Sequence, residues 1–125
     1  MTVNHIAPRT AMIVAPVGIW RDALVSLMRA QSNLLIAAVV DSLSAAQGLL
    51  LTTAIDVIVL DCGVDGANLS DFLRWLGVEY PSVRSVVAVD TQIQQPYYLA
   101  IGAHATLQKG RLDDALLRVI VADGG

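Results

Sequence analysis

The chain has 125 residues, enough for one domain with its own core, and 55% of them are hydrophobic while only 15% are charged. This composition excludes intrinsic disorder, which needs a polar and charge-rich chain, and it is typical of a fold whose sheet is buried on both faces. The formal net charge is −3 with no cluster of Lys and Arg, which argues against direct nucleic-acid binding, and the longest unbroken apolar run, 34–40, is far short of the roughly 20 residues of a membrane span.

Short apolar segments typical of buried strands alternate along the chain with segments of helical periodicity. Apolar helical stripes begin at Trp20, Leu69 and Leu112, while Ser42 and Asn68 are expected helix N-caps. Residues 1–9 are expected to form a flexible tail, 10–122 the domain, and 123–125 the start of a linker. The expected strands are 11–15, 35–40, 56–60, 84–89 and 105–108.

Strands that alternate with helices in this way predict right-handed parallel crossovers and helices on both faces of one sheet. The fold class is therefore α/β, a flavodoxin-like three-layer sandwich with five parallel strands in the order 2-1-3-4-5. In such a sheet the functional site lies at the carboxyl edge, so the residues that end or follow the strands matter most. These residues are Pro16, Asp41, Asp61, Asp90 and Lys109.

Three charged residues, Asp61, Asp90 and Lys109, should converge because they end neighbouring strands of the predicted order. One interpretation is ordinary, since the ends of strands are hydrated and often carry charge. The other is a site in which two carboxylates and an ammonium group face one another.

The residues around two of these positions carry a more specific pattern. The segment 61–66 reads DCGVDG before a helix, and the segment 102–109 reads GAHATLQK. Together they resemble the receiver domain of bacterial response regulators, the CheY-like superfamily, and most closely its NarL/FixJ branch. The resemblance extends over nearly the whole chain. It implies that Asp61 occupies the phosphoacceptor position and that Lys109 pairs with this aspartate or its phosphoryl group.

The chain also departs from the family at positions that the phosphorylation chemistry needs. Ala15 and Pro16 stand where receivers have two magnesium-binding acids, Asp90 replaces the Thr/Ser that binds the phosphoryl group, and Thr106 replaces the aromatic switch residue. The segment after Asp90 is short and contains Pro96, so the fourth helix should be short or irregular. These departures indicate an atypical receiver, or pseudo-receiver, with an incomplete phosphorylation site.

The substitutions predict that the chain has no cofactor and binds Mg²⁺ weakly or not at all, because Mg²⁺ requires several oxygen ligands. An ionised Asp90 would also repel a phosphoryl group, by about 4 kcal/mol per unit charge at roughly 4 Å and an effective dielectric of about 20. Our hypothesis is that Lys109 instead pairs with Asp61 and Asp90. The alternative is that Asp90 supplies a metal ligand and rebuilds a site with Asp61.

The resemblance implies two-component signal transduction through protein partners, without catalysis. DNA would be reached only through an output domain absent from these residues, and a homodimer is one candidate assembly. Tyr97 and Tyr98 form a candidate interface because aromatic residues are favoured there. The alternative is a conventional receiver phosphorylated on Asp61 by a histidine kinase. A nucleotide or flavin enzyme is disfavoured because the segment 16–20 has no glycine-rich phosphate-binding pattern.

Two further residues have an ordinary explanation. The single cysteine, Cys62, cannot form an internal disulfide, and we interpret it as a packing residue in a reducing compartment. His104 has no second ligand at metal-binding spacing and is expected to be structural. Because no signal peptide is recognised, we expect a cytoplasmic protein without membrane contact.

Overall fold

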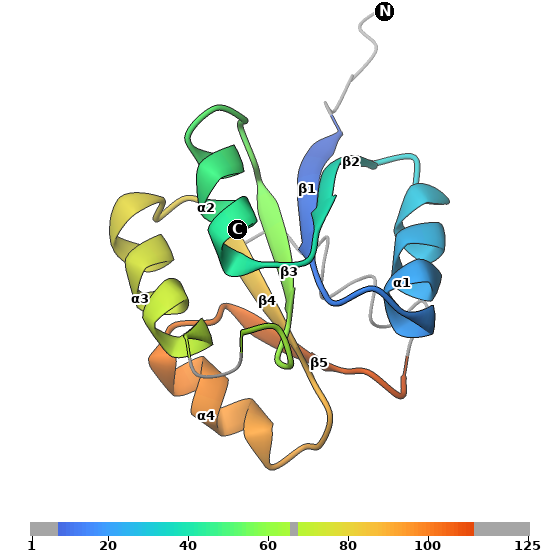
Figure 1. The fold of residues 1–125 in the computed structure, drawn as a ribbon. Coiled ribbons are helices and arrows are strands. Elements are labelled where there is room, and N and C mark those ends of the chain that lie inside the picture. The colour runs from blue at the N-terminus through green and yellow to red at the C-terminus, as the bar shows by residue number, and fades with distance from the viewer. Residues whose placement is uncertain (1–7, 66–67, 112–125) are drawn as a thin grey trace, which may run out of the picture.

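The computed structural model describes residues 8–65 and 68–111, so the predictions for 1–7, the last helix and the linker lie outside the described residues. Within this part of the chain, strands and helices alternate as the periodicity predicts (Figure 1). The elements are β1 (Arg9–Val14), α1 (Ile19–Arg29), β2 (Leu34–Val40), α2 (Leu43–Leu50), β3 (Val57–Asp61), α3 (Leu69–Glu79), β4 (Arg84–Val89), α4 (Gln94–Ile101) and β5 (Ala105–Gln108).

The five strands form one sheet in the order β2-β1-β3-β4-β5, and every neighbouring pair is parallel. Helix α1 packs against one face, and α2, α3 and α4 pack against the other (Figure 1). The predicted fold class and strand order are therefore confirmed. No helix in the described ranges has the length and apolar character needed to cross a bilayer.

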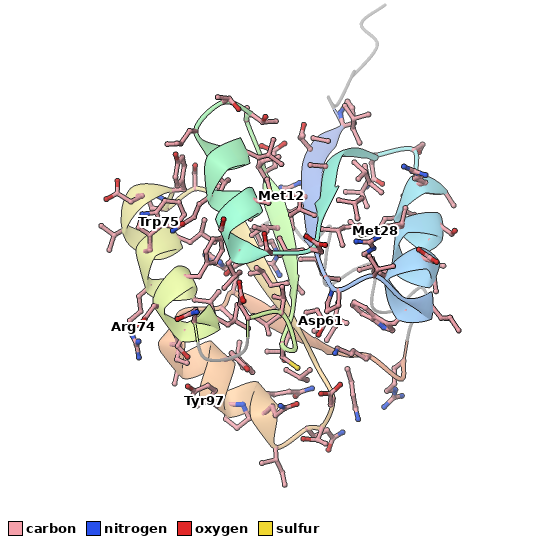
Figure 2. The ribbon with its side chains drawn as sticks, in the orientation of Figure 1. Met12, Met28, Asp61, Arg74, Trp75 and Tyr97 are labelled. Carbon is pink, nitrogen blue, oxygen red and sulfur yellow. The ribbon has the colours of Figure 1, made fainter. Side chains whose placement is uncertain are left out.

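Strand residues alternate between two hydrophobic cores, one on each face of the sheet. Met12 belongs to the core beneath α2, α3 and α4, whereas Met28 of α1 belongs to the opposite core (Figure 2). All five residues of β3 are buried because this central strand is covered on both sides. Burial on both faces explains why the strands read as continuous apolar runs.

Three strands have bounds that differ from the expected ones: β1 spans 9–14 rather than 11–15, β2 begins at residue 34 rather than 35, and β3 spans 57–61 rather than 56–60. β1 begins at Arg9 rather than at residue 11, because Arg9 pairs with Leu34 and its amide donates to the Asn33 carbonyl at 2.9 Å. β3 excludes Asp56, whose carboxylate accepts a hydrogen bond from the Thr10 amide at 2.8 Å, and includes Asp61. Asp61 is therefore the last residue of its strand and is held in the sheet, opposite Ala88.

The two expected N-caps behave differently. The Ser42 hydroxyl accepts a hydrogen bond from the Ala45 amide at 3.1 Å and caps α2, as predicted. Asn68 occupies the N-cap position of α3, but its side chain makes no capping hydrogen bond, so the prediction of a side-chain cap was wrong. Its backbone is already helical, whereas a capping side chain acts from an extended N-cap residue.

Helix α4 is short, with eight residues, as expected from the short segment after Asp90. Pro96 is its third residue, a position in the first turn where the missing amide leaves no intrahelical hydrogen bond unmade. The helix ends at Gly102, whose φ of 134° lies in the region that only glycine adopts without strain.

Candidate functional site

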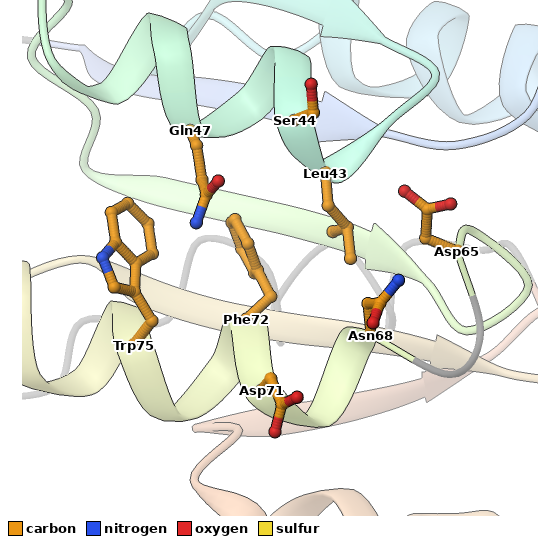
Figure 3. Close-up of a pocket in the computed structure, with 8 residues that line it drawn as sticks. All are labelled: Leu43, Ser44, Gln47, Asp65, Asn68, Asp71, Phe72 and Trp75. Atoms are coloured by element: carbon orange, nitrogen blue, oxygen red, sulfur yellow. The ribbon is translucent and has the colours of Figure 1, made fainter.

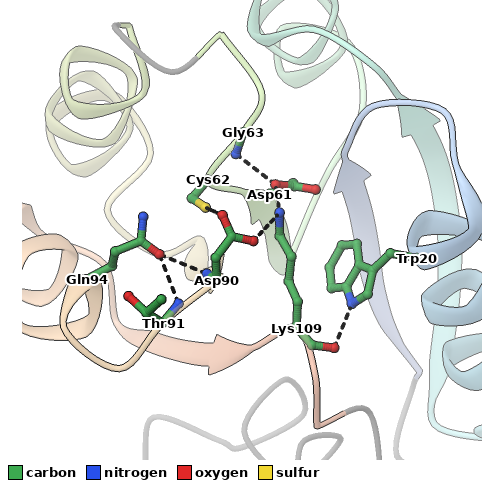
Figure 4. Close-up of polar contacts among 8 residues, drawn as sticks. All are labelled: Trp20, Asp61, Cys62, Gly63, Asp90, Thr91, Gln94 and Lys109. Carbon is green, nitrogen blue, oxygen red and sulfur yellow. Dashed lines mark hydrogen bonds and ion pairs between the residues drawn. The ribbon is translucent and has the colours of Figure 1, made fainter.

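Three charged side chains meet at the carboxyl edge of the sheet (Figure 4). Asp61 ends β3, Asp90 follows β4 and Lys109 follows β5, and these strands are neighbours in the sheet. The Lys109 Nζ lies 2.5 Å from Oδ1 of Asp61 and 3.2 Å from Oδ1 of Asp90. We call these three residues the ion-pair centre. The structure thus brings together the residues that strand order alone predicts to converge.

Asp61 is the buried member of the ion-pair centre, with a side chain only 9% exposed. Its Oδ1 also accepts a hydrogen bond from the Gly63 amide at 2.7 Å. A Cβ atom at position 63 would lie 3.2 Å from the same oxygen, so glycine permits this close approach of the backbone to the carboxylate. The strand end and the glycine together fix where the carboxylate points.

Asp90 is largely exposed but is held by contacts on both its side chain and its backbone. Its Oδ2 lies 3.6 Å from the Cys62 sulfur. Burial raises the pKa of the Cys62 thiol, with added contributions from the charges of Asp90 and Asp61, so the thiol stays protonated and donates to Asp90. The backbone amides of Asp90 and Thr91 donate to Oε1 of Gln94, at 2.8 and 3.1 Å. The loop between β4 and α4 is therefore anchored at its first residue.

Lys109 keeps its charge across the physiological pH range. Burial by itself lowers the pKa of Lys109, but the hydrogen bond and the charge of Asp61, with the hydrogen bond of Asp90, outweigh it and raise the pKa above its usual value. The Lys109 amide continues the sheet by donating to the Val89 carbonyl at 2.9 Å. Lys109 is thus fixed to β4 through its backbone amide and to both carboxylates through its ammonium group.

This chain has no acidic side chain at the two positions where receivers have magnesium-binding acids. Ala15 is buried and Pro16 is exposed. The Arg21 Nη1 donates to the Ala15 carbonyl at 3.3 Å, so a guanidinium cation stands beside this position.

The donor set does not fit Mg²⁺, which prefers an octahedron of oxygen ligands. Both carboxylates, Asp61 and Asp90, already contact the Lys109 ammonium group. Within 8–65 and 68–111, no group of three or more His, Cys, Asp or Glu side chains could hold a metal ion.

Trp20 is a site residue that the sequence analysis placed only at the start of an apolar helical stripe. Its indole N–H donates to the Lys109 carbonyl at 3.1 Å, and the Lys109 Nζ lies 5.6 Å from the centre of its ring (Figure 4). The available signal was topological, because Trp20 is the second residue of a helix that starts at the carboxyl edge of the sheet.

The remaining predicted residues lie in β5 and α4. Thr106 lies in β5 opposite Val87 and is half-buried. Tyr98 is buried in the core, and burial raises its pKa. Tyr97 is 55% exposed, and its hydroxyl lies 2.9 Å from the Ser70 hydroxyl of α3. Of the two tyrosines, only Tyr97 offers a surface for a partner.

His104 has a structural role. Its Nδ1 accepts hydrogen bonds from the amide of Ser85 at 3.0 Å and faces the Ser85 hydroxyl at 3.1 Å. These contacts join the start of β5 to β4.

A surface hollow of about 350 Å³ lies between α2 and α3, on the helical face opposite α1 (Figure 3). It includes no member of the ion-pair centre, so it is separate from the site described above. Its lining residues are Leu43, Ser44, Gln47, Asp65, Asn68, Asp71, Phe72 and Trp75.

No protein-family model and no curated protein matches the sequence. Solved structures do match, among them receiver domains and longer response regulators. The receiver of the response regulator NarL from Mycobacterium tuberculosis superposes with a TM-score of 0.79 at 16% identity, covering 94% of this chain and 100% of that one. A LuxR-family DNA-binding response regulator from Staphylococcus aureus gives 0.76 at 19% identity, covering 90% and 95%. RcsB from Salmonella typhimurium gives 0.80 at 12% identity, covering 94% of this chain but only 61% of RcsB.

The class that the fold defines is therefore the CheY-like, flavodoxin-like α/β domain. Within this class, the chain has the receiver fold of response regulators and is similar to receivers of the NarL type. At these identities the likeness concerns the fold alone.

Proposed function

We propose that this chain is an atypical receiver domain that acts in two-component signalling by protein contact, without phosphorylation of Asp61. One observation carries the proposal: the Lys109 ammonium group contacts both Asp61 and Asp90. The acceptor carboxylate therefore has a permanent cationic partner supplied by the chain itself.

The chemistry of phosphoryl transfer supports this proposal. Transfer to a carboxylate depends on positioning and on neutralising the charge of the phosphoryl group, which a metal ion usually supplies. Here Ala15 and Pro16 cannot bind a metal, and the Arg21 cation stands beside them. We therefore propose that Mg²⁺ binding is weak or absent.

Asp90 opposes phosphorylation for a second reason. A hydroxyl at this position could donate to a phosphoryl oxygen, whereas an ionised carboxylate cannot donate and repels it. The repulsion would amount to about 4 kcal/mol per unit charge at roughly 4 Å with an effective dielectric of about 20. Solvent reduces this value, because the Asp90 side chain is 62% exposed.

The similar proteins suggest the partners. RcsB has been solved bound to the promoter rprA in the presence of phosphomimetic BeF₃⁻, and CheY6 in complex with the P1 domain of CheA3. We propose that this chain likewise contacts proteins in the cytoplasm, and that it regulates transcription through a DNA-binding output domain outside these residues. Tyr97 on α4 is the candidate contact, with a second copy or an output domain as the partner.

Titration of the ¹⁵N-labelled chain with beryllofluoride and Mg²⁺, followed by NMR, tests the proposal. We expect no shifts around Asp61 at low millimolar Mg²⁺ and no labelling of Asp61 by acetyl phosphate in mass spectrometry. The matched control is a variant with Ala15→Asp, Pro16→Asp and Asp90→Thr, which should gain both responses, and Asp61→Asn should abolish them.

Large shifts around Asp61 in the unmodified chain, or its phosphorylation, would show instead that it is a conventional receiver. Circular dichroism of each variant verifies that the fold is retained.

A further inference from the structure

Trp20 contacts Lys109 at both ends of the lysine. The indole N–H binds the Lys109 carbonyl oxygen at 3.1 Å, and the ring lies 5.6 Å from the ammonium nitrogen of the same residue. A cation within about 6 Å of an indole ring is attracted by the ring's quadrupole. The lysine is thus held through its backbone and through its head group by one side chain.

These contacts bear on the ion pairs themselves. A free lysine side chain has many rotamers, and ordering it opposes the formation of any ion pair. Trp20 is half-buried and packs against the core on the α1 side of the sheet, so it is itself fixed. Its ring, 5.6 Å from the ammonium nitrogen, adds a cation–π attraction on the side of Lys109 that faces α1.

Arg21, the next residue of α1, also contacts a backbone carbonyl at the carboxyl edge of the sheet. Arg21 binds the carbonyl of Ala15, just after β1, while Trp20 binds the residue just after β5. Strands β3 and β4 lie between β1 and β5 in the sheet. Two side chains from the first turn of α1 therefore contact the backbone just after β1 and just after β5.

We propose that Trp20 is a positioning residue that holds Lys109 on Asp61 and Asp90 and links α1 to the end of β5. The inference rests on the proposed function, in which the ion-pair centre takes the place of a phosphorylation switch. Trp20 would then determine how strongly the Lys109 ammonium group is held against the two carboxylates.

The sequence provides a selective probe, because Lys109 is the only lysine in the chain. Its ¹⁵Nζ and ¹³C signals in NMR are therefore unambiguous in the full chain. Two variants separate the contacts: Trp20→Phe keeps an aromatic face but loses the N–H, and Trp20→Leu loses both. Trp75→Phe is the matched control, because Trp75 lies on α3, against the opposite core.

We expect the Lys109 carbonyl ¹³C signal to shift in both Trp20 variants and to stay unchanged in Trp75→Phe. Hydrogen exchange at Nζ should accelerate about two- to fivefold in Trp20→Leu and less in Trp20→Phe, as expected for loss of a cation–π contact.

Unchanged Nζ exchange and an unchanged carbonyl signal in a folded Trp20→Leu variant would overturn the inference and leave Trp20 as a packing residue. If Trp20→Leu does not fold, the comparison of Trp20→Phe with Trp75→Phe decides the question from the carbonyl signal. Beryllofluoride binding by the unmodified chain would overturn the proposed function while leaving the Trp20–Lys109 result intact, so the two failures are distinguishable.

Discussion

Replacing Lys109 with methionine removes the ammonium group while keeping a side chain of similar length. Asp61 would then keep the Gly63 amide as a partner but lose its cation inside a site where its side chain is only 9% exposed. Asp90, with a side chain 62% exposed, would be compensated by water. We therefore expect the cost of Lys109→Met to arise mainly at Asp61.

The distances give the size of the effect. At 2.5 Å and an effective dielectric of about 20, the attraction between Lys109 and Asp61 is about 7 kcal/mol before desolvation is subtracted. At 3.2 Å and nearly bulk dielectric, the pair with Asp90 contributes only about 1 kcal/mol. Breaking one partner of a buried pair costs about 3–5 kcal/mol, and the retained Gly63 contact and partial exposure reduce this. We expect the free energy of unfolding to fall by about 2–3 kcal/mol.

Urea unfolding at pH 7, followed by circular dichroism, measures this difference. The control is Arg74→Met, which removes a 3.3 Å surface pair with Asp71 and should change stability by less than about 1 kcal/mol. The cycle of Asp61→Asn with Lys109→Met should give a coupling energy of at least about 1 kcal/mol. A coupling energy within about 0.3 kcal/mol of zero would refute the reasoning, because the two groups would then be energetically independent.

Three further predictions concern the same region and the fold around it. Because the pKa of Lys109 is raised in the folded chain, the stabilisation from Lys109 is complete below the unfolded pKa of about 10.4 and is lost as pH rises through the folded pKa. In urea unfolding at a series of pH values, the stability difference between the chain and Lys109→Met should therefore shrink only above about pH 10.4, and a difference that shrinks below about pH 9 would contradict this. Burial raises the pKa of Cys62, so its reaction with a thiol reagent at pH 8 should be at least about 100-fold slower in the native chain than in urea, and equal rates would show an accessible thiolate. Ser42→Ala should cost about 1 kcal/mol in urea unfolding through loss of the α2 cap, whereas Ser44→Ala, at an exposed position in the same helix, should cost less than about 0.5 kcal/mol.

The strands and helices were predictable from periodic patterns in the sequence, and the strand order from the flavodoxin-like fold class that their alternation favours. Once five parallel strands are placed in the order β2-β1-β3-β4-β5, the ends of β3, β4 and β5 must be neighbours. The convergence of Asp61, Asp90 and Lys109 follows from this order without knowledge of any side-chain conformation. The exposure of one tyrosine on α4 was predictable for a similar reason, since adjacent residues do not share a helix face.

The contacts that were missed depend on geometry between distant segments. Trp20 and Lys109 are separated by 89 positions, and no local pattern indicates that an indole N–H will reach that carbonyl. The Cys62 contact with Asp90 depends on the rotamers of both side chains. Asn68 failed as a side-chain cap because cap preference describes residue type, whereas the observed backbone conformation decides whether the side chain can reach. Composition and periodicity therefore place elements, but not the rotamers on which the site depends.

A centre built from a permanent cation has a consequence for regulation. A conformational equilibrium shifts only as far as a ligand binds one state better than the other, and moving it from 1:99 to 99:1 takes about 5.5 kcal/mol. Lys109 is charged in every molecule at neutral pH, so it favours one arrangement by a constant amount and provides no signal by itself. Under the proposed function, the signal would come instead from contact with a protein partner. Gln94 connects α4 to the loop after β4, because it begins α4 and its Oε1 accepts hydrogen bonds from the amides of Asp90 and Thr91.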